Sequence, residues 1–445
     1  MLEPSPGGKK AKMKKTPIDR ISEYLRFGSR LGLERMEKLL AMLENPEQDL
    51  QVIHVAGTNG KGSVCRYIYE VLLANGYRTG LYISPFLQVF NERMEVDGNQ
   101  ITDDELELYT NLVLSKVELM LENGEESPTE FEIVTAIAFC YFKDKKCDFV
   151  VLEVGLGGSG DSTNVISKPV LSIITSISYD HMDRLGDTLE EIAGEKAGII
   201  KSGVPVVVNV DDPVAAKTIA RKAYEVGAPL YDVTRFDYRN INRNLNGQVF
   251  DTKIYGIDYR RVAIRMLGLH QIHNAMTALT ALEILRQGKI IRVTKDDFYH
   301  GMAKAMQPGR FEVFGEKPYI ILDGAHNQGG AESLLETMGE FFLDSRVLMV
   351  VGILADKDVD AMIESFSLIT DEFVATEPMS FRALPAHDLE ARLMAKNKRV
   401  VAVPDMEEAY HYAVNKAKNE GWDVLVFGGS LYLVGKIREL ICNER

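Results

Sequence analysis

Short apolar runs rich in β-branched residues, each followed by a turn and a helical stretch, recur through the first half of this chain. They lie at residues 51–56, 79–84, 148–154, 170–177 and 204–210. Near-continuous apolar strands that alternate with helices are typical of a parallel sheet covered on both faces. The pattern therefore predicts a doubly wound α/β domain.

The pattern is interrupted and then restarts. Segment 235–266 alternates polar and apolar residues around Asn and Gly turns, which predicts an antiparallel β excursion, and residues 271–286 predict a helix. Pro308 and Gly309 then punctuate the chain. Beyond them the strand and helix pattern resumes, with apolar runs at 319–325, 346–353, 372–377, 399–404 and 423–429.

The chain length favours two domains. A chain of 445 residues exceeds the size at which a single hydrophobic core stops growing. We predict a first domain over residues 1–306, with a mostly parallel, doubly wound sheet and a mobile tail at 1–17. Residues 307–445 are predicted to form a smaller, Rossmann-like α/β domain.

Composition excludes several classes of function. The net charge of −14 argues against a nucleic-acid partner, because binding to phosphate backbones depends on clustered Lys and Arg. No run approaches the ~18 to 20 apolar residues of a membrane helix. The cysteines form no CxxC pair, which favours a reducing compartment. We expect a cytoplasmic monomer without membrane or nucleic-acid partners.

A glycine-rich loop follows the first predicted strand and precedes a helix. Such a loop points backbone N–H groups and the positive end of the helix dipole at phosphate, and a lysine adds a full charge. The context of strand, loop and helix is the one that supports a phosphate-binding motif. The predicted phosphate-binding residues are Thr58, Asn59, Gly60, Lys61, Gly62 and Ser63.

The loop, GTNGKGS, resembles the phosphate loop of the Mur ligase superfamily. Residues 77–98, YRTGLYISPFLQVFNERMEVDG, are similar to the folylpolyglutamate synthase stretch that contains an SPxL loop. The chain therefore resembles the folylpolyglutamate synthase and dihydrofolate synthase family. Further matches are LGLERM (31–36), EVGLGG and DSTN (within 153–164), DHMDRLG (180–186), AGEKAG (193–198), LGLHQIHNA (267–275), PGRFEV (308–313), LDGAHN (322–327), GILADKD (352–358), RALPAHDL (382–389) and GGSLYLVGKIR (428–438).

The resemblance implies an ATP-dependent carbon–nitrogen ligase that requires Mg²⁺, with two metal ions expected and a monovalent cation left open. The γ-carboxylate of a folate would attack the γ-phosphate of ATP, and the amine of L-glutamate would then capture the acyl phosphate. Synthesis of dihydrofolate from dihydropteroate and glutamate stays open as a second activity. The expected partners are these small molecules.

The resemblance also implies roles for single residues. Lys61, Lys196, His181 and Glu153 would be catalytic, and Ser84, Glu153 and His181 would bind the metal. Lys196 matches a lysine that the family carries as a carbamate, which requires a desolvated, neutral amine. From the residues alone, an ion pair is the alternative for Glu153, although the GLGG that follows favours the metal. A turn before Pro85 is the better reading for Ser84, and a loop hydrogen bond is the alternative for His181, which only the resemblance makes a metal ligand.

Nucleotide contacts are expected from both domains. By resemblance, Asn274, Arg310, Asp323 and His326 surround the nucleotide together with the phosphate loop. A guanidinium is always charged and forks onto two oxygens, so Arg310 suits phosphate. A salt bridge at the hinge between the domains is the alternative for Arg310.

The folate-type substrate is expected on the first domain. Phe131 is suited to stack on a heterocycle, although an aromatic residue in such a run also fits a core. Many members of the family carry Arg and then a bulky residue where this chain has Ser159 and Gly160. The residues that match the family's substrate site are Leu31, Gly32, Leu33, Thr129, Phe131, Glu132, Ser159 and Gly160.

Two other functions compete with this one. A Mur-type ligase acting on a UDP-linked cell-wall precursor would share the phosphate loop, but the SPFL and LGLERM segments argue against it. A regulatory module switched by ATP would hydrolyse ATP without small carboxylates or amines. That reading leaves the PGR and LDGAHN segments unexplained.

Overall fold

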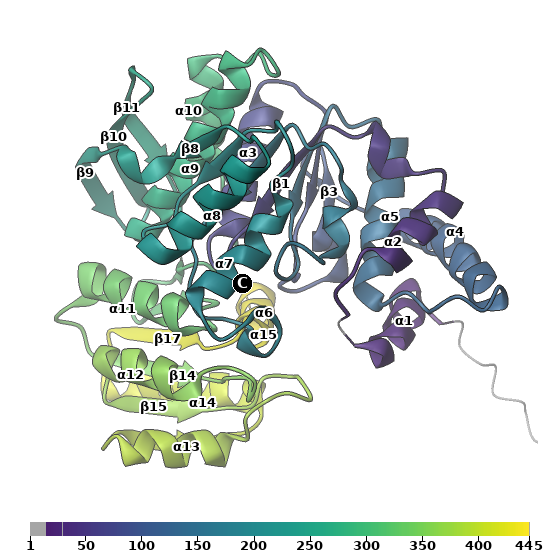
Figure 1. Ribbon diagram of the computed structural model, residues 1–445. Helices are drawn as coiled ribbons and strands as arrows, with labels where there is room; N and C mark the ends of the chain where they lie inside the picture. The colour runs from purple at the N-terminus through teal and green to yellow at the C-terminus, as the bar shows by residue number, and fades with distance from the viewer. Residues whose placement is uncertain (1–14, 29, 445) are drawn as a thin grey trace, which may run out of the picture.

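A computed structural model describes residues 15–28 and 30–444, and Figure 1 shows two α/β domains one above the other. The predicted tail lies outside the described residues up to position 14. Thr16 belongs to a folded element, because it caps α1 by accepting the Asp19 N–H at 3.1 Å.

The first domain is built on an eight-stranded sheet. Six of its strands, in the spatial order β2-β5-β1-β6-β7-β8, pair in parallel. The short β3 and β4 run antiparallel at the edge next to β2. In spatial order the strands are β4 (Asn99–Gln100), β3 (Met94–Val96), β2 (Thr79–Tyr82), β5 (Phe149–Glu153), β1 (Val52–Ala56), β6 (Leu171–Ile174), β7 (Val206–Val208) and β8 (Leu230–Asp232).

Helices cover both faces of this sheet, as the doubly wound pattern predicts. Successive residues of β5 alternate between two cores: Val151 packs with α3, α9 and α10, and Leu152 packs with α4 and α5. The helices are α1 (Pro17–Ser22), α2 (Glu34–Met42), α3 (Lys61–Ala74), α4 (Asp103–Glu122), α5 (Glu130–Asp144), α6 (Met182–Leu185), α7 (Leu189–Lys196), α8 (Pro213–Glu225), α9 (Leu269–Gln287) and α10 (Lys295–Lys304).

Short 3₁₀ helices complete the connections between these elements. They are η1 (Glu23–Phe27), η2 (Pro46–Asp49), η3 (Phe90–Arg93), η4 (Ser162–Val165), η5 (Ala197–Ile199) and η6 (Val233–Arg235).

The predicted antiparallel excursion is confirmed. It forms a separate three-stranded sheet of β9 (Tyr238–Asn244), β10 (Gly247–Ile254) and β11 (Ile257–Ile264). Its apolar face packs on the same core as α9, since Phe250, Tyr259 and Val262 are buried there.

The second domain has a six-stranded sheet, in the order β12-β13-β17-β14-β15-β16. All of its pairs are parallel except β12 with β13. The strands are β12 (Glu312–Phe314), β13 (Tyr319–Leu322), β14 (Val347–Val351), β15 (Glu372–Ala375), β16 (Arg399–Ala402) and β17 (Val424–Gly428), and the helices are α11 (Gln328–Phe342), α12 (Val359–Ile369), α13 (Ala386–Ala395), α14 (Met406–Glu420) and α15 (Leu431–Asn443).

The mixed α/β class with a second α/β domain is therefore as predicted. Sequence patterning missed β3, β4, β8 and β12, because strands of two or three residues show no periodicity of their own; β7 is as short but lies within the apolar run at 204–210. Within the described chain, no helix is long and apolar enough to cross a membrane.

Candidate active site

The phosphate loop lies between β1 and α3, and its geometry requires glycine at two positions. Gly57 has φ +145°, and a Cβ there would lie 1.8 Å from Thr175 Oγ1. Gly60 has φ +84°, and its Cβ would lie 2.3 Å from Asn274 Oδ1. Close packing and left-handed backbone together therefore demand glycine. The contact with Asn274 also brings α9 against the loop, where a nucleotide residue was predicted.

Two lysines meet at one carbonyl of this loop. Lys61 Nζ donates to Gly57 O at 3.1 Å and to Thr58 O at 3.0 Å, and Lys196 Nζ donates to Gly57 O at 2.9 Å. Lys196 is buried, and burial together with the charge of Lys61 lowers the pKa of Lys196 to about 7. A substantial fraction of Lys196 is therefore a neutral amine near neutral pH.

Glu153 ends β5 and lies beside Val55 in the sheet, two residues before the loop. Burial raises the pKa of Glu153 above its usual value, and the ammonium of Lys61 opposes that shift. The Ser84 N–H donates to Glu153 Oε2 at 3.3 Å. The structure therefore brings Ser84, Glu153 and Lys61 to one place.

This place fits a hard cation by its donor chemistry. A carboxylate and a neighbouring hydroxyl are ligands that Mg²⁺ prefers, and a buried carboxylate is costly without a cation. Across the described ranges, no group of three or more His, Cys, Asp or Glu side chains could hold a metal ion. Water and phosphate oxygens would complete the coordination shell of an ion held by Glu153 and Ser84.

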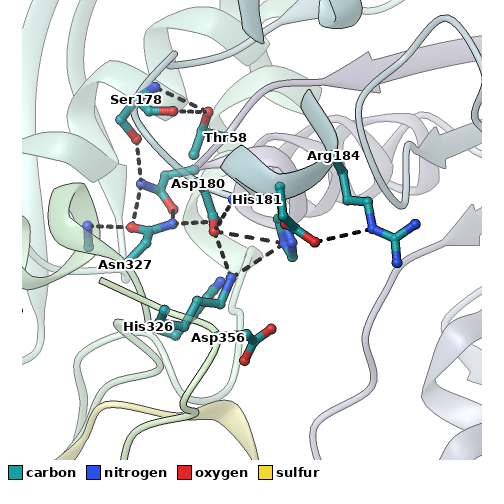
Figure 2. A network of polar contacts seen from close by, with 12 residues as sticks. Thr58, Ser178, Asp180, His181, Arg184, His326, Asn327 and Asp356 are labelled. Carbon is teal, nitrogen blue, oxygen red and sulfur yellow. Dashed lines mark hydrogen bonds and ion pairs between the residues drawn. The ribbon is translucent and has the colours of Figure 1, made fainter. Parts of the chain in front are cut away.

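His181 lies at the domain junction, where its Nε2 is 3.8 Å from Asp180 Oδ1. It precedes α6 with φ +52°, and Figure 2 shows it beside Asp180. Lys357 Nζ, from the second domain, lies 3.4 Å from His181 Nε2. Burial is the main cause that lowers the pKa of His181 to about 4, so the ring is neutral and Nε2 can accept from Lys357.

A pocket at the junction joins the two domains. The predicted residues Asn274, Arg310, Asp323 and His326 all line it together with the phosphate loop, so the structure places the predicted nucleotide residues around one hollow. Its lining is Asn59, Gly60, Gly62, Ser63, His270, Gln271, Asn274, Arg310, Asp323, Ala325, His326, Gly330, Ser333 and Leu334.

Local hydrogen bonds orient the residues of the second domain. Asp323, directly after β13, accepts the N–H groups of Phe311 and Ala325, each at 2.8 Å. Burial raises the pKa of Asp323, and Arg310 opposes the shift. His326 Nδ1 lies 2.8 Å from Gly324 O, a contact in which Nδ1 must donate. Burial lowers the pKa of His326 to about 4, so its Nε2 retains a lone pair.

The predicted substrate segments also meet. The Gly32 N–H donates to Gly160 O at 3.0 Å, and a Cβ on Gly160 would lie 2.9 Å from Leu31 Cβ. Ser159 donates through its N–H and its hydroxyl to Glu195 O, one residue before Lys196. The loop with Ser159 and Gly160, which departs from the family pattern, is thus in direct contact with the segment at 31–33, which matches it. Leu33 closes this segment as the residue before α2.

The segment from Thr129 to Glu132, which matches the family's substrate site, also has a structural role. Thr129 caps α5, with the Thr129 N–H donating to Glu132 Oε2 at 2.7 Å. The buried Glu132 also pairs with Arg35 at 3.1 Å. Phe131 packs against Gly155, where a Cβ would lie 2.4 Å from the ring. Thr129 and Glu132 therefore position the loops around the site, and Phe131 is only half-buried beside them.

Sequence reasoning assigned no role to several residues that the structure brings to the site. His270, Gln271 and Ser333 line the pocket. Asp180 and Lys357 form an ion pair across the junction. A usable signal existed for most of them, because they lie in the LGLHQIHNA, DHMDRLG and GILADKD segments at the ends of predicted strands.

The two domains match two models of known families. The Mur ligase middle domain matches residues 55–282, and the Mur ligase glutamate ligase domain matches residues 309–431. Fold and site thus define a ligase of the Mur type.

Similar proteins show which family of Mur-type ligases this chain belongs to. The dihydrofolate synthase/folylpolyglutamate synthase of Bacillus subtilis is 40% identical over 94% of this chain and 97% of its own length. The folylpolyglutamate synthase of Lacticaseibacillus casei is 34% identical over 96% and 98%. This chain belongs to the folylpolyglutamate synthase and dihydrofolate synthase family.

Solved structures agree with this family. The Mycobacterium tuberculosis folylpolyglutamate synthase complexed with ADP has a TM-score of 0.88 at 30% identity, covering 95% of this chain and 98% of that one. Escherichia coli FolC in complex with DHPP and ADP has a TM-score of 0.85 at 30% identity, covering 97% and 99%.

Proposed function

We propose that this chain is an ATP-dependent ligase that adds L-glutamate to the γ-carboxylate of a tetrahydrofolate and releases ADP and phosphate. The observation that carries this function is the pocket at the junction, which is lined by the phosphate loop together with Arg310, Asp323 and His326. The ADP held by similar solved structures supports a nucleotide in that pocket.

The reaction needs no protein nucleophile. A carboxylate oxygen of the folate forms a bond to the γ-phosphorus of ATP, and the bond to the bridging oxygen breaks as ADP leaves. The glutamate amine then attacks the acyl carbon, phosphate leaves and the amine loses a proton. Both steps move negative charge, so catalysis depends mainly on fixed positive groups.

The chain supplies these groups from both domains. Lys61 and the N–H groups at the start of α3 face the phosphates, and Arg310 forks onto phosphate oxygens from the linker. The neutral amine of Lys196 can take up CO₂, and the resulting carbamate would place a negative charge beside Lys61. A site shared by two domains also excludes water from the acyl phosphate.

Glu153 and Ser84 would hold Mg²⁺, which neutralises charge on the transferred phosphoryl group when bound. His181 belongs to this set by family resemblance, and the ammonium of Lys357 at Nε2 competes with that role in the present arrangement. Two metal ions, a monovalent cation, the domain boundary at 306/307, a monomeric state, a cytoplasmic location and the absence of nucleic-acid or membrane partners stay predictions.

Dihydrofolate synthesis is a second candidate activity, favoured by the relative at 40% identity that is named for both reactions. Purified chain is given Mg-ATP and L-glutamate with either tetrahydrofolate or dihydropteroate, and ADP release and product mass are followed. Growth by one glutamyl unit supports the ligase and identifies its acceptor. Turnover only with a UDP-muramoyl substrate would keep the fold and reject the folate.

A further inference from the structure

A loop of the first domain runs from the metal-ligand candidates to the last helix of the second domain. Ser84 bonds to Glu153 at one end of this loop, residues 84–89. The carboxylate of Glu92 accepts the N–H groups of Leu87 at 2.7 Å and of Gln88 and Val89 at 3.1 Å. These three bonds hold residues 87–89 in place, only three residues after Ser84, so a displacement at Leu87 can reach Ser84 through the short segment between them.

The far end of the loop is part of the second domain's core. Leu87 packs on the cluster that contains Val434 of α15. A Cβ on Gly435 would lie 2.0 Å from Leu87 O, and a Cβ on Gly309 would lie 3.2 Å from Leu87 Cδ2. Helix α15 therefore approaches the loop as closely as backbone allows, and only glycine permits this approach.

Arg438, one turn after Gly435, ties the same place together by charge. Its Nη1 donates to Gln88 Oε1 at 2.5 Å, and its Nε donates to Glu312 Oε2 at 2.9 Å. Glu312 also accepts the Gly309 N–H at 2.9 Å. One guanidinium thus holds the loop on one side and the linker that carries Arg310 on the other.

We propose that Arg438 is a positioning residue for the ligase reaction: it fixes the 84–89 loop and the 309–312 linker so that the Ser84 and Glu153 pair and Arg310 face the same phosphoryl group. This role rests on the proposed function. Arg438 touches no reacting atom and acts through Gln88 and Glu312. The alternative is an ordinary contact that only stabilises the domain interface.

The first experiment compares Arg438→Met, Arg438→Lys and Gln88→Ala with wild type. Arg346→Met is the matched control, because Arg346 lies before β14 of the same domain and its guanidinium donates to Glu420 O and Gly421 O and lies over the Trp422 ring, which all belong to the second domain. We expect Arg438→Met to lower kcat at least tenfold, Arg438→Lys to recover part of it and Gln88→Ala to lower it severalfold. The control should stay within twofold, as should the KM for glutamate in every variant.

A double-mutant cycle with Ser84→Ala separates positioning from simple stabilisation. If Arg438 acts through the loop, the loss in the double variant is much smaller than the product of the single losses. The proposal would be overturned if the losses in kcat of the single variants multiply in the double variant. It would also be overturned if Arg438→Met and Gln88→Ala fold and turn over within twofold of wild type.

Hydrogen exchange gives a readout that does not need turnover. The amides of Leu87, Gln88 and Val89 should exchange faster in Arg438→Met than in Arg346→Met, and unchanged exchange rejects the proposal. If wild type does not ligate glutamate, the proposed function is rejected instead. Hydrogen exchange would then still show whether Arg438 holds the 84–89 loop in place.

Discussion

Lys357 of the second domain lies with its Nζ 2.6 Å from Asp180 Oδ1 of the first domain, and both side chains are nearly buried. Asp180 Oδ2 also accepts from Asn327 Nδ2 at 2.8 Å. The side-chain amides of Asn327 and Asn59 donate to each other at 3.0 and 3.1 Å. The phosphate loop is therefore linked to both the ion pair and the start of α11.

Lys357→Met should destabilise the junction, because it leaves the buried carboxylate of Asp180 without its cation. Removing one partner of a buried pair costs about 3 kcal/mol or more. The single tryptophan, Trp422, lies in the second domain, so its fluorescence during urea unfolding reports on that domain. The double variant Asp180→Asn with Lys357→Met should recover part of the lost stability. An equal loss of stability in Lys357→Met and in the double variant would contradict the prediction.

The same pair predicts an acid dependence. Burial favours a raised pKa for Asp180, but the charge and hydrogen bond of Lys357, together with the nearby His181 and His326, outweigh it and hold this pKa below the ordinary 3.8. A lowered folded pKa gives stability that is present above the unfolded value and is lost as pH falls through the folded one. The difference between wild type and Lys357→Met should therefore be constant at neutral pH and shrink below about pH 4.

The sequence was sufficient for the layers of the fold, because long apolar strands and a helix such as 271–286 carry their own periodicity. It was also sufficient to predict that the phosphate loop, Glu153 and Arg310 belong to one site, since each follows a predicted strand or lies on the predicted linker. Contacts between distant segments could not be predicted. Nothing local to Gly435 shows that Leu87 O approaches it, and nothing local to Asp180 names Lys357 as its partner.

His181 shows a further reason why the site could not be predicted completely from the sequence. Its position in DHMDRLG matched the family, but the group that faces its Nε2 comes from residue 357, far along the chain. Thr129 and Glu132 likewise matched a substrate pattern, and the structure shows them capping α5 and pairing with Arg35. A motif gives residue types, whereas the partners that complete each side chain's hydrogen bonds depend on the tertiary fold.

Lys61→Ala should abolish product formation and leave the fold intact. Loss of one charge directed at the transferred phosphoryl group costs about a hundredfold or more in kcat. Gly57 O keeps its bond from Lys196, so the loop retains support. Lys295→Ala is the matched control, because this exposed lysine also donates to a backbone carbonyl, Asp258 O, at 2.8 Å. Turnover in Lys61→Ala near the control's level would remove the phosphate-loop assignment.

Lys196 should show a pH dependence set by its pKa of about 7. Only the neutral amine reacts with CO₂, and its fraction rises as pH rises through this value. At a pH equal to the pKa about half of the lysine is neutral, and one unit lower roughly a tenth is, so activity should fall about fivefold between these two pH values unless bicarbonate is added. A carbamate signal from ¹³C-bicarbonate in wild type, absent in Lys196→Ala, checks the assignment by NMR.

Small carboxylates test the same role chemically. Acetate or formate should partly restore activity to Lys196→Ala by replacing the carbamate's charge. Lys201→Ala is the control, because Lys201 is also partly buried and donates to Asn164 O at 3.1 Å. Its activity should not respond to added carboxylate. Full activity of Lys196→Ala without any added anion would exclude the carbamate.

Gly160→Ala should weaken folate binding without affecting ATP. Its Cβ would lie 2.9 Å from Leu31 Cβ and 3.0 Å from Gly32 N, so the 31–33 segment must shift to accommodate it. We expect the KM for the folate acceptor to rise about tenfold, roughly 1.4 kcal/mol, with the KM for ATP within twofold. Gly339→Ala is the matched control, because Gly339 is an exposed residue of α11 and its Cβ would meet nothing within 4 Å. If both variants leave the folate KM unchanged, the contact between the two loops does not shape the acceptor site; if the ATP KM rises instead, the loops act on the nucleotide pocket.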